Sequence, residues 1–306
     1  MHAVTSLSTA SHMDGYMRRV AECNTGLEEL PTLTPFAISG QAVGQLKPKF
    51  VEHLARFPDV FSVSGPVGPS GQVTLVAGLD SVDKRTAAVA GVMETLRSEG
   101  VITGWRDELY PVTSNFYDDP VMLLERAAAV SFGIKAYGVH INGYVETADR
   151  GLCVWVAKRS MAKPNWPGKL DHIVAGGQPH GISVMDNVVK ECQEEASMPA
   201  ELARSATPVG CVSYMTISSV GLKPDVLFVF DLKLPESFVP APQDGEVEHF
   251  TLMPVADVAQ LVSQTTEFKI NCNLVIVDFM LRHGLIAPDA PGYLALCKAM
   301  RAGECS

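Results

Sequence analysis

The feature of this 306-residue chain that most constrains its fold is an apolar run that ends in a double glycine and leads into a helix rich in glutamate. The run from Ile173 to Ala175 ends at Gly176-Gly177, and Gly181 follows after a short gap. Ser183 then opens the helix, and Asp186, three residues later, gives the spacing of a capping box. Such a turn lets the backbone amides of the double glycine approach an anionic substrate near the start of the helix.

Three carboxylates fall within five residues of this helix, at Glu191, Glu194 and Glu195. At about 100° per residue, Glu191 and Glu195 lie one turn apart and Glu194 lies about 60° to one side. They border an apolar face made by Val184, Met185, Val188, Cys192 and Ala196. Clustered carboxylates repel one another unless a cation lies among them, and oxygen ligands suit Mg²⁺ or Mn²⁺. The alternative interpretation is a solvated acidic face.

The segment resembles the Nudix box, which runs glycine, five residues, glutamate, seven residues, Arg-Glu, an apolar residue, one more, Glu-Glu, one more and glycine. Gly176, Glu191-Cys192 and Glu194-Glu195 are in register with that pattern. Ile182, Lys190 and Ser197 stand where the pattern has glutamate, arginine and glycine. The resemblance implies that Glu191, Glu194 and Glu195 are metal ligands and catalytic residues of a hydrolase that cleaves diphosphate bonds.

A wider resemblance, over roughly residues 28 to 300, is to the Nudix proteins associated with thiamine pyrophosphokinase. It rests on the segments Gly104 to Tyr110, Glu125-Arg126, Phe132 to Tyr144, Lys158 to Ser160, Leu170 to Gly177 and Lys190 to Ser197. In that subgroup Ile182, Lys190 and Ser197 are usual variants of the box. The resemblance implies an α/β/α sandwich with a mixed sheet, preceded by a smaller α+β domain. It also implies hydrolysis of thiamine diphosphate, and preferentially of oxidised forms such as oxothiamine diphosphate, to the monophosphate and phosphate.

Residues outside the helix are candidates for the rest of the site. Glu246 is favoured over Glu248 as a general base or further metal ligand, although both fall in a run that also fits a solvated acidic loop. Three basic residues are candidates to bind the distal phosphate: Arg159, Lys163 and Lys169. Arg159 is favoured because it directly follows a strand. Further candidates for substrate contacts are Gly176, Gly177, Lys190, Trp105, Arg106, His140, Asn142 and Tyr144. For His140, a structural role in an alternating strand is the alternative.

Periodicity predicts a mixture of helices and strands, hence an α/β or α+β fold. We expect a flexible N-terminus over residues 1–27, an α+β domain over 28–132 and a Nudix domain over 133–306. Helices are predicted at 48–57, 81–97, 122–130 and 271–282. Strands are predicted at 71–77, at 137–145 and 152–157 as a hairpin, and at 207–216 and 225–232.

The charge and composition of the chain exclude several classes of binding partner. The net charge of −10 argues against binding to nucleic acid through a general basic field. No apolar run approaches the roughly 20 residues needed to span a membrane. The seven cysteines contain no C-x-x-C pair or close Cys/His cluster, so neither a zinc site nor a disulfide framework is indicated. We expect a small-molecule diphosphate as substrate, a homodimer by analogy with Nudix proteins, and a cytoplasmic location, with plastid or mitochondrion as alternatives.

Two other functions remain open from the sequence. One is hydrolysis of another diphosphate such as ADP-ribose, because the box does not distinguish diphosphate substrates. The other is a non-catalytic ligand-binding module on a Nudix fold, which the altered box favours and the complete glutamate trio opposes.

Overall fold

The computed structural model describes residues 7–303, and its centre is a seven-stranded mixed sheet in the order β11-β12-β7-β8-β13, with β10 added beside β7 and β9 beside β8. The strands are β7 (Ala136–Thr147), β8 (Gly151–Arg159), β9 (Leu170–His172), β10 (Val174–Gly177), β11 (Thr207–Ile217), β12 (Leu222–Lys233) and β13 (Val247–Pro254). The β12–β7 pair is parallel and the other pairs are antiparallel. The predicted hairpin is confirmed as β7–β8.

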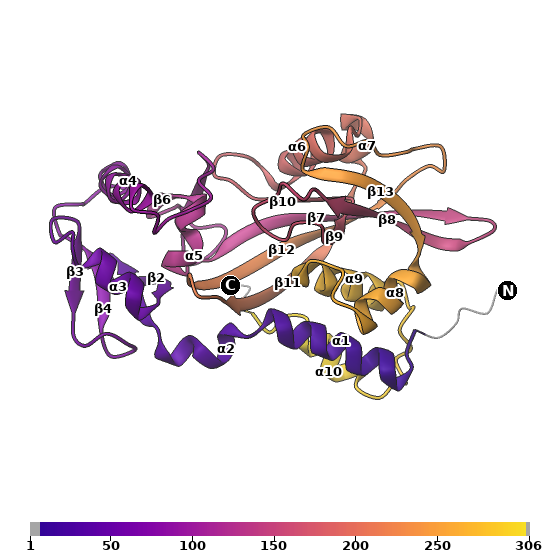
Figure 1. The fold of residues 1–306 in the computed structure, drawn as a ribbon, viewed down its shortest axis with the longest axis horizontal. Coiled ribbons are helices and arrows are strands. Elements are labelled where there is room, and N and C mark those ends of the chain that lie inside the picture. The colour runs from indigo at the N-terminus through magenta and orange to yellow at the C-terminus, as the bar shows by residue number, and fades with distance from the viewer. Residues whose placement is uncertain (1–6, 304–306) are drawn as a thin grey trace.

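Helices cover both faces of this sheet, which gives the expected α/β/α sandwich (Figure 1). On one face lie α6 (Val184–Ala196) and α7 (Ala200–Arg204), and on the other lie α1 (Ala10–Cys23), α8 (Val255–Gln264), α9 (Ile270–Arg282) and α10 (Tyr293–Ala299). Two separate apolar cores follow from the two layers. One joins the apolar side of α6 to the sheet, and the other joins α1, α8, α9 and α10 to the opposite face.

A smaller α+β unit precedes the sandwich and lies beside one end of it (Figure 1). Its sheet has the order β2-β1-β4-β3, and a separate two-stranded sheet pairs β5 with β6. Its elements are α2 (Gly26–Glu29), the 3-10 helix Leu30–Thr32, β1 (Thr34–Ile38), β2 (Gln41–Leu46), α3 (Pro48–Leu54), β3 (Phe61–Ser64), β4 (Gln72–Leu75), α4 (Val82–Ser98), β5 (Leu109–Val112), β6 (Met122–Glu125), the 3-10 helix Arg126–Ala128 and α5 (Ala129–Phe132). This unit has a core of its own, centred on Phe36, Phe50, Phe61 and Phe132.

The N-terminal segment differs from the expectation of a flexible residue 1–27 stretch. Residues 10–23 form helix α1, and residues 1–6 lie outside the described part of the chain. Met13, Tyr16, Val20 and Cys23 fall on one face of α1 and are buried in the same core as α8 and α9. A Cβ on Gly15 would lie 2.2 Å from the carbonyl oxygen of Ser263, so α1 crosses α8 in close contact. Burial of this face orders the segment, and it packs on the sandwich rather than on the small unit.

The prediction of a helix at 122–130 is wrong in its first half. Met122–Glu125 is strand β6, paired with β5, and Met122 and Leu124 are buried on the core side. The Glu125 carboxylate accepts hydrogen bonds from the backbone N–H groups of Arg106, at 2.9 Å, and Ala127, at 3.1 Å. These bonds hold the chain in a bend before the short helix α5 begins. Tertiary pairing has therefore overridden local helix propensity here.

The described residues contain no helix that is both long and apolar enough to cross a lipid bilayer.

Candidate functional site

The glycine-rich turn and the helix after it form as the sequence predicts. Strand β10 pairs with β7 and places Gly176 opposite Val139 and Gly177 opposite Gly138. At the start of α6, the Ser183 hydroxyl accepts from the Asp186 N–H at 3.1 Å and donates to the Asp186 carboxylate at 2.7 Å. The turn is thereby fixed between a paired strand and a capped helix.

The backbone at Ser197 explains why the Nudix box has glycine at this position. Ser197 caps α6 in the left-handed conformation, with φ at 51°, which favours glycine. Its hydroxyl donates to the carbonyl oxygen of Ala241 at 2.9 Å. This bond holds the non-glycine residue in place and ties the end of α6 to the segment before β13.

Glu191 and Glu195 project from α6 against strand β10. The Glu195 carboxylate is 8% exposed and accepts a hydrogen bond from the Ala175 N–H at 2.9 Å. A Cβ on Gly176 would lie 2.2 Å from the carboxyl carbon of Glu191, so any other residue there would displace that carboxyl group. Burial, and for Glu195 also the Glu191 charge, raises the pKa of both carboxyl groups. Glu195 is buried and Glu191 is half-buried, so a positive charge placed beside them would stabilise the ionised form of both carboxyl groups.

Lys190 supplies part of that positive charge. Its ammonium lies 3.0 Å from the Glu191 carboxylate and 2.8 Å from that of Glu194, whose side chain is 51% exposed. A cation therefore already bridges two of the three glutamates. Carboxylate oxygens suit a hard divalent ion, which would have to replace the Lys190 ammonium beside Glu191 and Glu194. Within residues 7–303 these three glutamates do not form a gathered ligand set: Glu191 and Glu194 pair with Lys190, and Glu195 accepts from the Ala175 N–H.

A cleft of about 1000 Å³ adjoins this region and lies between the small unit and the sandwich. Ala175, Gly176 and Gly177 form part of its lining; the Glu191 carboxyl group packs against Gly176, and that of Glu195 bonds to the Ala175 N–H. Its charged lining is mainly basic, comprising Arg106, Arg126, Arg159, Lys163, Lys223 and Lys269 against Glu22, Asp225 and Glu246. Tyr110, Tyr137 and Trp166 add aromatic surface. The cleft is suited in size and charge to an anionic small molecule that carries a ring.

The small unit contributes two side chains that sequence reasoning did not single out. A Cβ on Gly177 would lie 1.9 Å from the Tyr110 hydroxyl and 3.3 Å from the Arg126 guanidinium carbon. Arg126 also pairs with Glu108 at 2.6 Å. The only sequence signal for either residue is that both lie in segments that resemble the thiamine-associated subgroup. Their contact with the double glycine brings the small unit into the site.

Arg159, Lys163 and Glu246 all line the cleft, as their predicted roles require. Each already has a partner. Arg159 donates to Asp171 at 2.8 Å and to the carbonyl oxygens of Trp166 and Asn165. Lys163 forms an ion pair with Glu246, and although burial opposes it, this contact lowers the pKa of Glu246. An ionised Glu246 at the cleft wall can accept a proton from water.

The other predicted contacts divide between the cleft and the core. Arg106 and His140 line the cleft, although His140 is buried and bonded to His172. Trp105 packs under Arg97, and Lys169 donates to the carbonyl oxygen of Thr266, so neither is among the lining residues. Tyr144 faces a separate hollow of about 430 Å³ that includes Asp231. Asn142 is likewise placed away from the cleft, with its amide donating to Asp231 at 2.9 Å.

Asp231, which accepts the Asn142 amide, is expected to make a pH-dependent contribution to folding stability. Burial alone would raise its pKa, but hydrogen bonds from His283, Arg282 and Asn142 lower it to about 2. A lowered folded pKa contributes stability above the unfolded value, near 4, that is lost as the pH falls through about 2. We expect Asp231→Asn to cost about 1–2 kcal/mol at pH 7. In urea unfolding, the gap between wild type and variant should close between pH 4 and pH 2, and a constant gap would contradict this role.

Comparison with known proteins extends over both halves of the chain. Residues 15–136 match the family described as a domain of unknown function, DUF4743. The chain is 50% identical over 297 residues to Nudix hydrolase 24, chloroplastic, of Arabidopsis thaliana, covering 97% of this chain and 80% of that protein. It is 48% identical over 301 residues to Nudix hydrolase 20, chloroplastic, of the same plant, with the same coverage. Among solved structures, DR0079 of Deinococcus radiodurans is similar with a TM-score of 0.40 and 17% identity, covering 55% of this chain and 95% of that one.

Proposed function

The chain belongs to the Nudix hydrolase family, and from that premise we propose that it hydrolyses diphosphate bonds in thiamine diphosphate-type substrates, preferentially oxidised ones such as oxothiamine diphosphate. The products are the monophosphate and phosphate. The family membership supports the hydrolase activity. The choice of substrate rests on the resemblance of this chain to the Nudix proteins associated with thiamine pyrophosphokinase.

The observation that carries the proposal is the position of the cleft. The double glycine of β10 forms part of its lining, the Glu191 carboxyl group packs against Gly176, and the charged lining is mainly basic. A diphosphate held there has its charge opposed by arginine and lysine side chains. The aromatic residues of the lining, Tyr110 and Trp166 among them, suit a heteroaromatic ring on the same substrate.

Each residue then has a distinct role in the reaction. Glu191, Glu194 and Glu195 would hold Mg²⁺ or Mn²⁺, and a bound ion would neutralise phosphate charge and lower the pKa of the attacking water. Lys190 turns from its carboxylate partners towards the substrate. Ionised Glu246 takes the proton of the water, while Arg159 and Lys163 orient the distal phosphate for in-line displacement.

The small unit makes the site more specific than the box alone. Tyr110 and Arg126 meet Gly177 at the cleft wall, and Arg106 contributes further positive charge. We assign these side chains to recognition of the substrate outside the bond that breaks. An Arg126→Leu variant should therefore weaken the preference for the oxidised thiamine compound more than it lowers metal-dependent turnover.

The experiment that tests the substrate class is a comparison of kcat/KM for oxothiamine diphosphate, thiamine diphosphate and ADP-ribose with Mg²⁺ or Mn²⁺. We expect the thiamine compounds to be preferred, with the oxidised form first, and the product to be the monophosphate. Preference for ADP-ribose would overturn the substrate assignment but not the assignment as a hydrolase.

The names of the relatives also favour the plastid over a cytoplasmic location, and imaging of a full-length fluorescent fusion in plant cells tests that location.

A further inference from the structure

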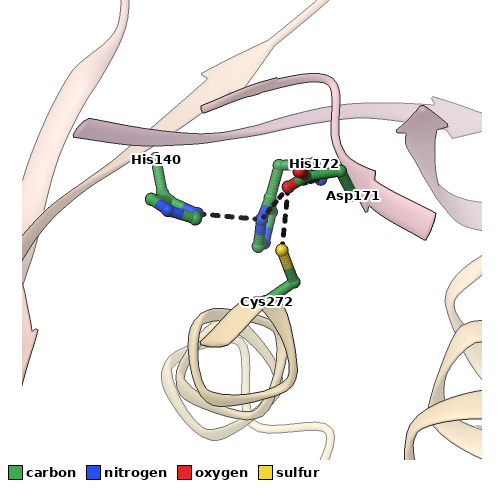
Figure 2. A group of neighbouring side chains, drawn as sticks. All are labelled: His140, Asp171, His172 and Cys272. Carbon is green, nitrogen blue, oxygen red and sulfur yellow. Dashed lines mark hydrogen bonds and ion pairs between the residues drawn. The ribbon is translucent and has the colours of Figure 1, made fainter. Parts of the chain in front are cut away.

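We propose that His140, Asp171, His172 and Cys272 bind a transition-metal ion of the Zn²⁺ class, at a site separate from the glutamates of α6. Figure 2 shows the four side chains turned towards one another from strands β7 and β9 and helix α9. One ligand atom from each lies within 4.8 Å of the others, and all four residues are buried. The inference does not depend on the proposed hydrolase activity.

The donor atoms are of the kinds that zinc prefers. Two imidazole nitrogens, one sulfur and one carboxylate oxygen make a four-ligand set. With metal–ligand bonds of about 2.0–2.3 Å, the ligand atoms of a tetrahedral site lie roughly 3.3–3.8 Å apart. The Nδ1 atoms of His140 and His172 are 3.1 Å apart, and Asp171 Oδ1 lies 2.8 Å from Cys272 Sγ and 3.9 Å from His172 Nδ1. Displacements of less than about 1 Å would complete the site.

As a hydrogen-bond network alone, the cluster is incompletely satisfied. The Nδ1 atoms of the two histidines face each other, so one proton serves both, and His172 Nε2 is buried with no hydrogen-bond partner among residues 7–303. A neutral imidazole keeps a nitrogen lone pair for a metal, and both rings are buried at the centre of the cluster.

Asp171 is arranged with one oxygen towards the cluster and one towards basic side chains. Its Oδ2 atom accepts from Arg159 at 2.8 Å and pairs with Lys269 at 3.4 Å. Its Oδ1 atom accepts the thiol proton of Cys272. Supporting hydrogen bonds of this kind orient ligands around protein-bound metals. When the ion binds, the S–H bond of Cys272 breaks, the sulfur bonds the metal, and the proton leaves to solvent.

The position of the cluster beside the large cleft suggests how an ion would enter and what it would hold in place. His140, Arg159 and Lys269 line the large cleft, so an ion can reach the cluster from its floor. Once bound, the ion would join helix α9 to strands β7 and β9, across the face of the sheet that α9 covers. It would also fix Asp171, which holds Arg159 at the cleft wall. The class of role that follows is structural, with four protein ligands.

Zinc binding by the full chain is the test. The protein is first freed of metal with a chelator and then loaded with Zn²⁺. Mass spectrometry of the metal gives the zinc content per chain, and competition with a chromophoric chelator gives the affinity. We expect one tightly held equivalent per chain. Loading with Co²⁺ should give the intense near-ultraviolet band of a thiolate–cobalt bond, which the carboxylates of α6 cannot produce. Wild-type protein that holds no Zn²⁺ and gives no such band would overturn the proposal.

Variants locate the ion. Cys272→Ser should abolish the thiolate band and weaken Zn²⁺ binding by about 10-fold or more, and His140→Gln should weaken binding while keeping a Cys272 thiolate. Cys153→Ser is the matched control, because Cys153 is equally buried but lies outside the cluster. Glu195→Gln should keep both the equivalent and the band, whatever happens to its hydrolase activity. An unchanged band in Cys272→Ser, or its loss in Cys153→Ser, would refute the assignment.

Discussion

Glu195→Gln is expected to lower metal-dependent turnover by about 10³-fold, which corresponds to about 4 kcal/mol of transition-state stabilisation. The glutamine keeps the size of the side chain and can still accept the Ala175 N–H, but it cannot supply the negative charge that holds a divalent ion. The change is therefore confined to charge at a position that is 8% exposed.

The same variant should be no less stable than wild type in the absence of metal. Burial and the Glu191 charge raise the pKa of Glu195, so its stabilising contribution is present at low pH and is lost as the pH rises through the folded pKa. At neutral pH, glutamine removes the cost of a buried carboxylate. Thermal unfolding in chelator should show an equal or higher Tm, and Mg²⁺ should raise the Tm of wild type more.

The exposed carboxylate Glu201 provides the control, because it lies in the next helix, α7, and Glu201→Gln changes the same charge. We expect that variant to keep full turnover. Equal losses in Glu195→Gln and Glu201→Gln would point to a general charge effect. Full turnover in Glu195→Gln would remove this residue from the site.

Gly176→Ala is expected to lower turnover by about 100-fold, because the new methyl group would lie within 2.2 Å of the Glu191 carboxyl carbon and displace that carboxylate. The displaced atoms are the end of a flexible side chain, so the cost in stability should be at the low end for an overpacked site, about 1 kcal/mol. The backbone at Gly176 does not have a positive φ, so crowding rather than strain is the cause. Steady-state kinetics and urea unfolding measure the two effects.

A double-mutant cycle separates this contact from a general defect of the turn. In a Glu191→Ala background the obstruction is gone, so the stability cost of Gly176→Ala should largely disappear. Gly91→Ala serves as the glycine control, since a Cβ there meets nothing within 4 Å, and it should raise stability by up to about 1 kcal/mol. Additive costs in the cycle would contradict the proposed packing of Glu191 on Gly176.

Features that depend on local chemistry could be predicted from the sequence. The Ser183 cap, the apolar side of α6 and the β7–β8 hairpin each follow from residues a few positions apart. Helix α1 was missed because its buried positions carry meaning only against α8 and α9. Strand β6 was missed because its partner β5, and not its own propensity, determines its conformation.

Contacts between distant parts of the chain could not be predicted in the same way. Tyr110 meets Gly177 only because the small unit lies against the sandwich, and no spacing in the sequence encodes that distance. The cluster proposed to bind a metal is the plainest example, since Asp171 and Cys272 are 101 positions apart. Local spacing gave no indication of a zinc site, because the fold and not a C-x-x-C motif brings these ligands together.

The most direct test of the central claim is phosphate release from oxothiamine diphosphate by the purified wild-type chain, measured in chelator and again after Mg²⁺ or Mn²⁺ is restored. Release that stops in chelator, returns with the metal and leaves the monophosphate as co-product is the predicted result. A folded, metal-supplied protein that binds the compound without releasing phosphate would contradict the account and identify the chain as a ligand-binding module on a Nudix fold.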